Sequence, residues 1–367
     1  MERRQFIGAT AAVWLGTMMP TAANGSPVAM PVDLNWRSDV IKTIAHNRAE
    51  RMPVVTGVSM KMDGSELAIV GDDHYVGIYD MVSQTYTHGI DAHHDWVRSA
   101  VYSPNGKQLA TAGNDRALRV WANGDYKSAL FTRNHGDAIV KLAYSPDSTK
   151  LAVVGFEKTM RIYDAQTGRV IQKLACPCPD NHSVAFSVDG GMVAAAGRCG
   201  TIRVWDVGAG TLATQVKAHR RRIRSLQFTS DGQLVSVSDD QLIKVVDPKL
   251  GRVVSVLPRQ PSKLFAAKLL PDNKLATGGS DNQIRIWDLE TQQEVGMLRG
   301  HTGTVSCLDS RNGMLVSGSY DTQVRLWQVP TEKQSLERRA NHQWRPCLLY
   351  TSPSPRDQRG SRMPSSA

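Results

Sequence analysis

The chain has 367 residues, of which 41% are hydrophobic and 21% are charged, and its formal net charge is +10. A chain of this size and composition can bury a large core, and no run of about eighteen apolar residues predicts a membrane-spanning helix. The basic balance favours an acidic partner over a basic one.

The first residues have the order of features found in export signals. Arg3 and Arg4 precede a short apolar run at residues 8–19, and small residues around Ala23 follow it. This segment resembles a twin-arginine signal, so we expect residues 1–25 to be removed and the protein to be periplasmic or exported. The alternative is an ordinary cytoplasmic N-terminus. Residues 26–38 read as a Pro-containing linker.

Short apolar runs separated by turn residues fill the rest of the chain. Residues 300–328, GHTGTVSCLDSRNGMLVSGSYDTQVRLWQ, contain three such runs, at 305–308, 314–318 and 324–327. Runs of β-branched residues bounded by Gly, Asn, Asp and Ser predict antiparallel strands joined by tight turns. Three strands cannot bury both faces alone, so the unit needs neighbours.

The unit repeats. The position of its last Trp recurs along the chain at Tyr79, Trp121, Tyr163, Trp205, Val246, Trp287 and Trp327. By subtraction, the spacings are 42, 42, 42, 41, 41 and 40 residues. Self-similarity at a fixed period near 40 residues is typical of a repeat architecture.

The chain here resembles the WD-repeat β-propeller family, whose Gly-His, Asp and Trp-Asp positions can be followed through all seven units. The resemblance covers residues 39–328. It implies an all-β fold, a single seven-bladed β-propeller of four-stranded antiparallel sheets. It also implies that the N-terminal strand, at residues 40–46, completes the last blade and closes the ring, which removes the exposed sheet edges.

In that family each repeat carries a hydrogen-bonded tetrad of His, Ser or Thr, Asp and Trp. The matching positions here are His93, Thr111, Asp115, Trp121; His301, Ser317, Asp321, Trp327; His219, Ser236, Asp240 with Val246 in place of Trp; and Thr277, Asp281, Trp287 with Gln260 in place of His. Such a set also suggests nucleophilic catalysis. We favour a structural role, because the set repeats around the ring and an active site would not.

The cysteines of the fourth unit fall where the tetrad residues are missing. Cys176 and Cys178 flank the His position at 177, and Cys199 stands at the Asp position. We expect Cys199 to form a disulfide with Cys178 or Cys176, in place of the His–Asp bond. Zinc binding with His182, or three small reduced side chains, are the alternatives. Cys307 is expected to lie in the core.

The C-terminal segments stand apart from the repeats. Residues 329–346 include SLERRANH, which resembles a further outer strand or the start of a truncated repeat. Residues 347–367 contain CLLYTSPSPRD and SRMPSSA, which resemble in-frame translation of a sequencing adapter. A genuine disordered tail rich in Pro, Ser and Arg is the alternative.

Basic residues gather in the loops that lead into the innermost strands, on the face that we call the inlet face. The predicted partner-binding residues are Arg98, Arg220, Arg221, Arg222, Arg224, Arg259 and Lys263. Arg98 and Arg224 occupy the same offset in their repeats. With the nearby His94, Trp96 and Phe265 they form the arginine and aromatic mixture typical of interaction sites. A purely solvated charged surface is the alternative.

We therefore expect a monomeric, non-catalytic scaffold that binds an acidic protein through propeller loops, with no cofactor or metal. Nucleic acid is disfavoured, because the interleaved exposed aromatics of single-strand binders are missing. The alternative is an exported enzyme or ligand-binding propeller with a site at the central channel. His74, His182 and Asp137 are its candidate residues.

Overall fold

The computed structural model describes the chain at residues 38–42 and 53–329. The segments assigned above to the export signal, to the linker up to residue 37 and to positions 330–367 lie outside these residues. Ser38, placed in the linker by the sequence analysis, is the first residue of a strand.

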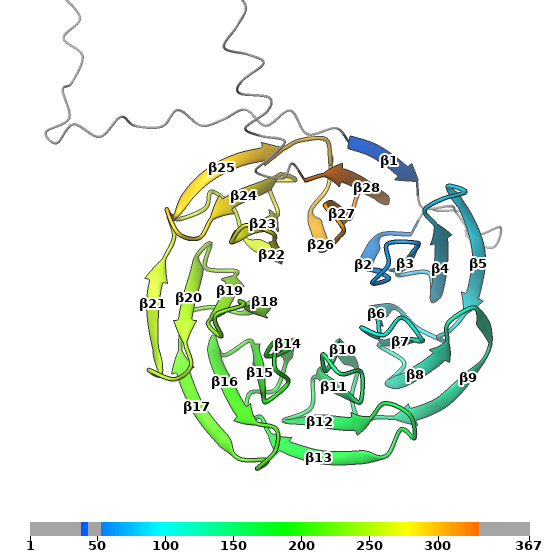
Figure 1. Ribbon diagram of the computed structural model, residues 1–367, viewed down its shortest axis with the longest axis horizontal. Helices are drawn as coiled ribbons and strands as arrows, with labels where there is room; N and C mark the ends of the chain where they lie inside the picture. Colours follow the sequence, from blue (N-terminus) through cyan, green and yellow to red (C-terminus); the bar gives the residue numbers. More distant parts are fainter. Residues whose placement is uncertain (1–37, 43–52, 330–367) are drawn as a thin grey trace, which may run out of the picture.

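Seven four-stranded antiparallel sheets are arranged in a ring (Figure 1). The innermost strands are β2 (Val55–Met60), β6 (Val97–Tyr102), β10 (Ile139–Tyr144), β14 (Asn181–Phe186), β18 (Ile223–Phe228), β22 (Leu264–Leu270) and β26 (Val305–Arg311). The second strands are β3 (Glu66–Gly71), β7 (Gln108–Gly113), β11 (Lys150–Gly155), β15 (Met192–Gly197), β19 (Leu234–Ser238), β23 (Lys274–Gly279) and β27 (Met314–Ser319).

The third strands are β4 (Tyr75–Asp80), β8 (Ala117–Ala122), β12 (Thr159–Asp164), β16 (Thr201–Asp206), β20 (Ile243–Asp247), β24 (Ile284–Asp288) and β28 (Gln323–Gln328). The outer strands are β5 (Thr85–Asp91), β9 (Asp125–Asn134), β13 (Val170–Ala175), β17 (Leu212–Lys217), β21 (Arg252–Val256), β25 (Gln293–Leu298) and β1 (Ser38–Lys42). We number the blades 1 to 7 by their innermost strand, from β2 to β26. The predicted seven-bladed propeller is confirmed.

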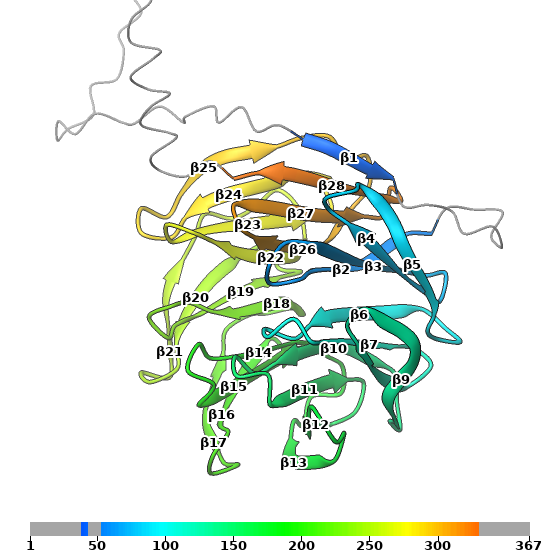
Figure 2. The same ribbon diagram turned by 45° about the vertical axis from the view of Figure 1, so that its right-hand side comes forward.

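The ring is closed by the N-terminal strand. β1 runs antiparallel to β28, with Ile41 opposite Val324, and so supplies the outer strand of blade 7. In Figures 1 and 2 the strand lies along the outer edge of that blade. Closure of this kind leaves neither terminal blade with an incomplete sheet, as the sequence analysis predicted.

The core lies between neighbouring blades. At the seam, Val55, Met60 and Leu67 of blade 1 pack against Val316 and Val324 of blade 7. The equivalent cluster recurs between the other blades, because the inner strands are apolar on both faces. Blades 7 and 1 can approach closely because the second strand of blade 7 has a Gly near its end: a Cβ atom on Gly318 would lie 2.5 Å from Cγ1 of Val55 in blade 1.

Polar side chains also join the inner strands of adjacent blades. Equivalent positions in three blades accept a backbone N–H of the next blade: Ser59 Oγ from Tyr102 at 3.1 Å, Gln227 Oε1 from Leu269 at 2.9 Å and Asp309 Oδ2 from Met60 at 2.7 Å. The bond from Asp309 crosses the seam. These contacts fix the blades around the axis and so hold the channel walls in place.

Candidate binding site at the mouth of the central channel

The innermost strands surround a cavity of about 800 Å³ on the propeller axis. A cavity of this size is within the range that binds small molecules or the side chains of a partner. The sequence analysis expected any site to lie here or on the adjacent loops.

One position of each innermost strand forms a ring at the inlet side of this cavity, directly after the strand begins. Its members, which we call the mouth ring, are Thr56, Arg98, Val140, His182, Arg224, Phe265 and Ser306, and all seven line the cavity. Their spacings are 42, 42, 42, 42, 41 and 41 residues. The sequence analysis matched only Arg98 with Arg224; the same period would have found the other five.

Arg224 is held by two contacts that orient its guanidinium. Its Nε and Nη2 donate to the two carboxylate oxygens of Asp239, at 2.8 and 3.1 Å. Its Cζ atom lies 4.7 Å from the centre of the Phe265 ring, which is a cation–π distance. Because these contacts already hold the guanidinium in one orientation, little side-chain entropy remains to be lost when a ligand binds.

Arg98 is placed similarly on the neighbouring side of the mouth. Its Nε donates to Asn114 Oδ1 at 2.5 Å, and its Cζ lies 5.7 Å from the centre of the Trp96 ring. Burial lowers the pKa of Arg98, and the nearby Arg224 lowers it further. A guanidinium nevertheless keeps its charge at any ordinary pH, so both arginines present positive charge to the channel.

Asp180 joins two basic groups beside the ring. Its carboxylate lies 2.5 Å from His182 Nε2 and 2.6 Å from Arg222 Nη2. Burial lowers the pKa of His182 more than Asp180 raises it, so the imidazole is neutral near pH 7. Burial would raise the pKa of Asp180, but the His182 hydrogen bond and Arg222 outweigh it. The positive charge of Arg222 is therefore already neutralised by Asp180, unlike that of a free cation on the surface.

The predicted partner-binding residues fall into two groups. Arg98 and Arg224 line the cavity at its mouth, whereas Arg222, which is paired with Asp180, and the exposed Arg220, Arg221, Arg259 and Lys263 are not among the lining residues. Arg259 is bonded to Gln241 at 2.8 Å. Two aromatic side chains at the mouth, Trp96 and Tyr320, are 40% and 48% exposed. Tyr320 lies in the turn after the second strand of blade 7 and was not among the predicted partner-binding residues.

The complete tetrads have the expected geometry. In blade 2, His93 lies 2.9 Å from both Asp115 and Thr111, and Trp121 Nε1 donates to Thr111 at 3.1 Å. In blade 7 the corresponding distances for His301, Asp321, Ser317 and Trp327 are 2.8, 2.7 and 2.8 Å. These buried networks support the inlet loops and leave no free nucleophile.

The degraded tetrads keep part of the network. In blade 5, His219 bonds Asp240 at 3.0 Å and Ser236 at 2.9 Å, with Val246 in place of the Trp. In blade 6, Trp287 donates to Thr277 at 3.2 Å, while Asp281 pairs with Arg285 at 2.6 Å. Gln260 is buried there and donates to Pro258 instead of bridging to Asp281.

Blade 4 replaces the tetrad with a covalent bond. Cys178 and Cys199 form a disulfide, with their Cα atoms 6.0 Å apart. Cys178, and not position 177, therefore occupies the His position. Cys176 is a free, buried thiol whose Sγ contacts Asn181 Oδ1 at 3.0 Å. Of the pairings that the sequence left open, the structure has the one with Cys178. Cys307 is buried in the cluster at the seam between blades 7 and 1.

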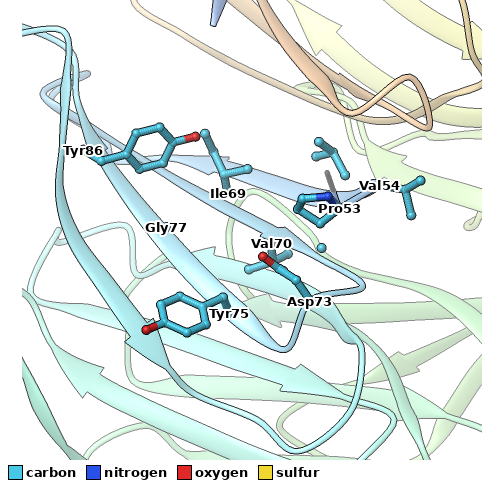
Figure 3. Close-up of a pocket in the computed structure, with 10 residues that line it drawn as sticks. Pro53, Val54, Ile69, Val70, Asp73, Tyr75, Gly77 and Tyr86 are labelled. Atoms are coloured by element: carbon cyan, nitrogen blue, oxygen red, sulfur yellow. The ribbon is translucent and has the colours of Figure 1, made fainter. Parts of the chain in front are cut away.

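Blade 1 has lost the tetrad in another way. Ile69 stands at the hydroxyl position, and Gly77 stands where six other blades have Arg or Lys. Figure 3 shows the ring of Tyr86 crossing toward Ile69 in this space. A Cβ atom on Gly77 would lie 2.8 Å from the Tyr86 ring, so the glycine makes room for it. The small cavity that remains, about 20 Å³, has room for about one water molecule.

The residues proposed for an enzyme do not converge. His182 lines the channel cavity, but His74 and Asp137 are not among its lining residues. Across positions 53–329, no cluster of three or more His, Cys, Asp or Glu side chains is arranged to hold a metal ion. In the part of the chain that the structure describes, no helix is long and apolar enough to cross a membrane.

A closed ring of repeated four-stranded blades with a loop-lined axial mouth defines a β-propeller of repeat type. The family model described as "WD domain, G-beta repeat" matches residues 84–122, 127–164, 179–206, 210–247, 251–288 and 292–328, more than half of the chain. The chain therefore belongs to the WD40-repeat family. Most of the matched ranges run from the outer strand of one blade to the third strand of the next, which is the phase that ring closure by β1 requires.

Similar proteins include "Pre-mRNA-processing factor 19" of Bos taurus, 34% identical over 25% of this chain and 19% of that protein. "WD repeat-containing protein 55" of Danio rerio is 32% identical over 24% of this chain and 23% of that protein. "Cell division control protein 4" of Saccharomyces cerevisiae is 30% identical over 24% of this chain and 11% of that protein. The chain spans less than a quarter of the length of each of these relatives.

Proposed function

We propose that the protein is a non-catalytic interaction scaffold that binds an acidic protein segment at the channel mouth. The observation that carries this proposal is the pairing of two oriented guanidinium groups, Arg98 and Arg224, with aromatic side chains around an open cavity. Arginine and aromatic residues are enriched among the residues that dominate binding energy at protein interfaces. Proteins of this repeat family typically bind other proteins, which agrees with this role.

The arginines have capacity left for a ligand. Arg224 uses its Nε and Nη2 for Asp239, and Arg98 uses its Nε for Asn114. The remaining guanidinium nitrogens point to a carboxylate as the complementary group, because a carboxylate accepts charge-assisted hydrogen bonds from them. The neutral His182 adds no competing positive charge to the ring near pH 7.

The aromatic groups provide the apolar part of the site. Trp96 and Tyr320 are partly exposed, and Phe265 lies under Arg224. An acidic segment that also carries an apolar or aromatic side chain would bury these surfaces while its carboxylates reach the arginines. A mixed acidic and apolar peptide is therefore a better fit than a purely acidic polymer.

The experiment is a selection of displayed peptides against the purified protein. We expect the selected peptides to be enriched in Asp and Glu next to an aromatic residue, and to lose binding to a R98Q/R224Q variant. The matched control is R220Q/R221Q, which removes the same charge from exposed loop positions outside the cavity lining. Peptides that distinguish neither variant from wild type would overturn the proposal.

We also propose export as the route by which this protein reaches its partner. The support is the RR-containing N-terminal sequence together with the Cys178–Cys199 disulfide, since disulfides persist in oxidising compartments. Fractionation of cells producing wild type and an R3K/R4K variant tests this. We expect the wild type in the exported fraction and the variant retained; equal distribution of the two would contradict export by this route.

A further inference from the structure

The wall of the central channel carries an excess of positive charge further along the innermost strands than the mouth ring. Lys141 on β10, Lys268 on β22 and Arg311 on β26 all line the cavity. The carboxylate near all three is Asp309 on β26. Three cations against one carboxylate leave an excess of two positive charges in a confined space.

The single negative charge of Asp309 is already shared among one cation and two backbone donors. Its Oδ1 lies 2.7 Å from Lys268 Nζ and accepts from the backbone N–H of Ser310 at 2.9 Å. Its Oδ2 accepts from the backbone N–H of Met60 at 2.7 Å. Both oxygens are thus engaged in holding blades 6, 7 and 1 together, and Lys268 is the cation that they neutralise.

Lys141 and Arg311 remain without a full set of partners. Among residues 53–329, no hydrogen bond or ion pair reaches the ammonium of Lys141, which is half-buried in the cavity wall, and the Nε of Arg311 is buried without an acceptor. Burial raises the pKa of the neighbouring Cys307 thiol to about 11, so this group is uncharged and compensates nothing. Burial also lowers the pKa of Lys141, as expected for an amine that lacks an anion.

The position of Lys141 is unusual within the repeat. The equivalent residues of the other innermost strands are Gly57, Ser99, Ser183, Ser225, Ala266 and Cys307. Six of the seven equivalent positions therefore hold small residues, and only Lys141 has a long, charged side chain. Nothing in the local packing requires a side chain of this length. Removing an ammonium group from water without a partner costs free energy, and a bound anion would offset that cost.

We infer that the channel binds a small divalent oxyanion, with Lys141 as its principal contact. A phosphate or a short dicarboxylate has this charge and fits within the cavity of about 800 Å³. Arg311 supplies further positive potential through its place beside Asp309, and the mouth ring is the way in. This site is separate from the protein-binding mouth, because it uses neither Arg98 nor Arg224.

The test is calorimetric titration of the full-length protein with inorganic phosphate and, separately, with succinate, at fixed ionic strength in a buffer without other divalent anions. We expect one or both to bind, and Lys141→Gln to weaken binding by about 10-fold to 100-fold, the usual value of a charge-assisted hydrogen bond. Lys141→Arg keeps the charge and retains most of the affinity. Lys173→Gln, on the exposed outer strand β13, is the matched control and changes affinity by less than about twofold.

Folding is monitored by thermal denaturation without added anion. Lys141→Gln is expected to melt at the same temperature as wild type or above it, since it removes an uncompensated charge. Phosphate binding without succinate binding assigns the ligand to phosphates, and the reverse assigns it to dicarboxylates. If neither probe binds, or if Lys141→Gln binds as tightly as wild type, the inference is overturned. Anion binding that is lost only in R98Q/R224Q would place the anion at the mouth and would also overturn the inference. Loss of acidic-peptide binding with anion binding unchanged would bear on the proposed function and not on this inference.

Discussion

Blades 2 and 4 link the same two positions of the repeat by different chemistry. In blade 2, His93 and Asp115 link the loop before the innermost strand to the turn after the second strand through a hydrogen bond of 2.9 Å. In blade 4 the same two positions are Cys178 and Cys199, and a disulfide makes the link. Blade 4 also has Ala195 where blade 2 has Thr111, so Trp205 is the one residue of its tetrad that remains.

The comparison shows that a hydrogen bond and a disulfide can make the same link between these two positions. Both links lie beside the channel mouth. The loop that contains Cys178 also presents Asp180, which organises His182 and Arg222, whereas the loop that contains His93 presents Trp96 and leads to Arg98. We therefore expect the two links to be sensitive to different conditions: the link of blade 4 to redox potential and that of blade 2 to pH.

The largest expected effect is the loss of the blade 4 link. Reduction, or the Cys199→Ser substitution, should lower the free energy of unfolding by about 3 kcal/mol, because a loop of 21 residues is no longer closed in the unfolded chain. Urea denaturation with and without a reductant measures this. The variant should be insensitive to the reductant; a wild type that is equally insensitive would show that the bridge does not stabilise the fold.

A slightly smaller effect is expected when the centre of a complete tetrad is removed. Ser317→Ala in blade 7 leaves the indole N–H of Trp327 without an acceptor and His301 Nε2 without a donor, which should cost about 2 kcal/mol in unfolding free energy. Chemical denaturation of the variant gives the value. Ser306→Ala, which changes a hydroxyl of the mouth ring outside any tetrad, is the control. Equal losses in the two variants would contradict a special role for the tetrad.

The pH dependence of stability should come from the blades that keep a His–Asp pair. Burial would raise the pKa of Asp240, but the hydrogen bond and charge of His219, together with the backbone N–H of Arg220, lower it to about 2, below the 3.8 of an unperturbed Asp. This group therefore stabilises the fold above about pH 4, and its contribution, on the order of 1–2 kcal/mol, is lost as the pH falls toward 2. Burial also lowers the pKa of His93 and of His301, so their contribution is lost first, below about pH 6.5. Asp240→Asn should flatten the stability profile below pH 4 and leave the loss near pH 6 unchanged; an unchanged profile below pH 4 would refute this account.

The smallest effect is expected for basic residues away from the mouth. Arg259→Gln removes an exposed side chain whose partner is Gln241, so stability should change by less than about 0.5 kcal/mol. Binding of a selected acidic peptide should change by less than about twofold. A larger loss of binding would extend the site beyond the mouth ring.

The repeated features of the fold could be predicted from the sequence because each one recurs. The seven marks from Tyr79 to Trp327 fixed the number of blades, and the match between residues 40–46 and later outer strands predicted the closing strand. Local turn chemistry and the spacing of 40 to 42 residues are visible along the chain, so they can be read without knowing the tertiary structure.

Features that depend on contacts between repeats could not be predicted in this way. Nothing in the sequence around Asp309 indicates that it crosses the seam to Met60, a partner 249 positions away. The sequence analysis grouped Arg220 and Arg221 with Arg224, because neighbours in a charged run look alike. In the structure Arg224 lines the channel and its two neighbours lie on an exposed loop, since position within the strand decides which side chain faces the axis.

The central claim is that the oriented arginines of the mouth ring recognise acidic groups. The most direct measurement is the affinity of one acidic, aromatic-containing peptide for wild type and for R98Q/R224Q by fluorescence anisotropy, repeated at low and high salt. The account predicts a loss of about 100-fold in the double variant, together with a shallower salt dependence. An affinity that is the same for both proteins at both salt concentrations would contradict it.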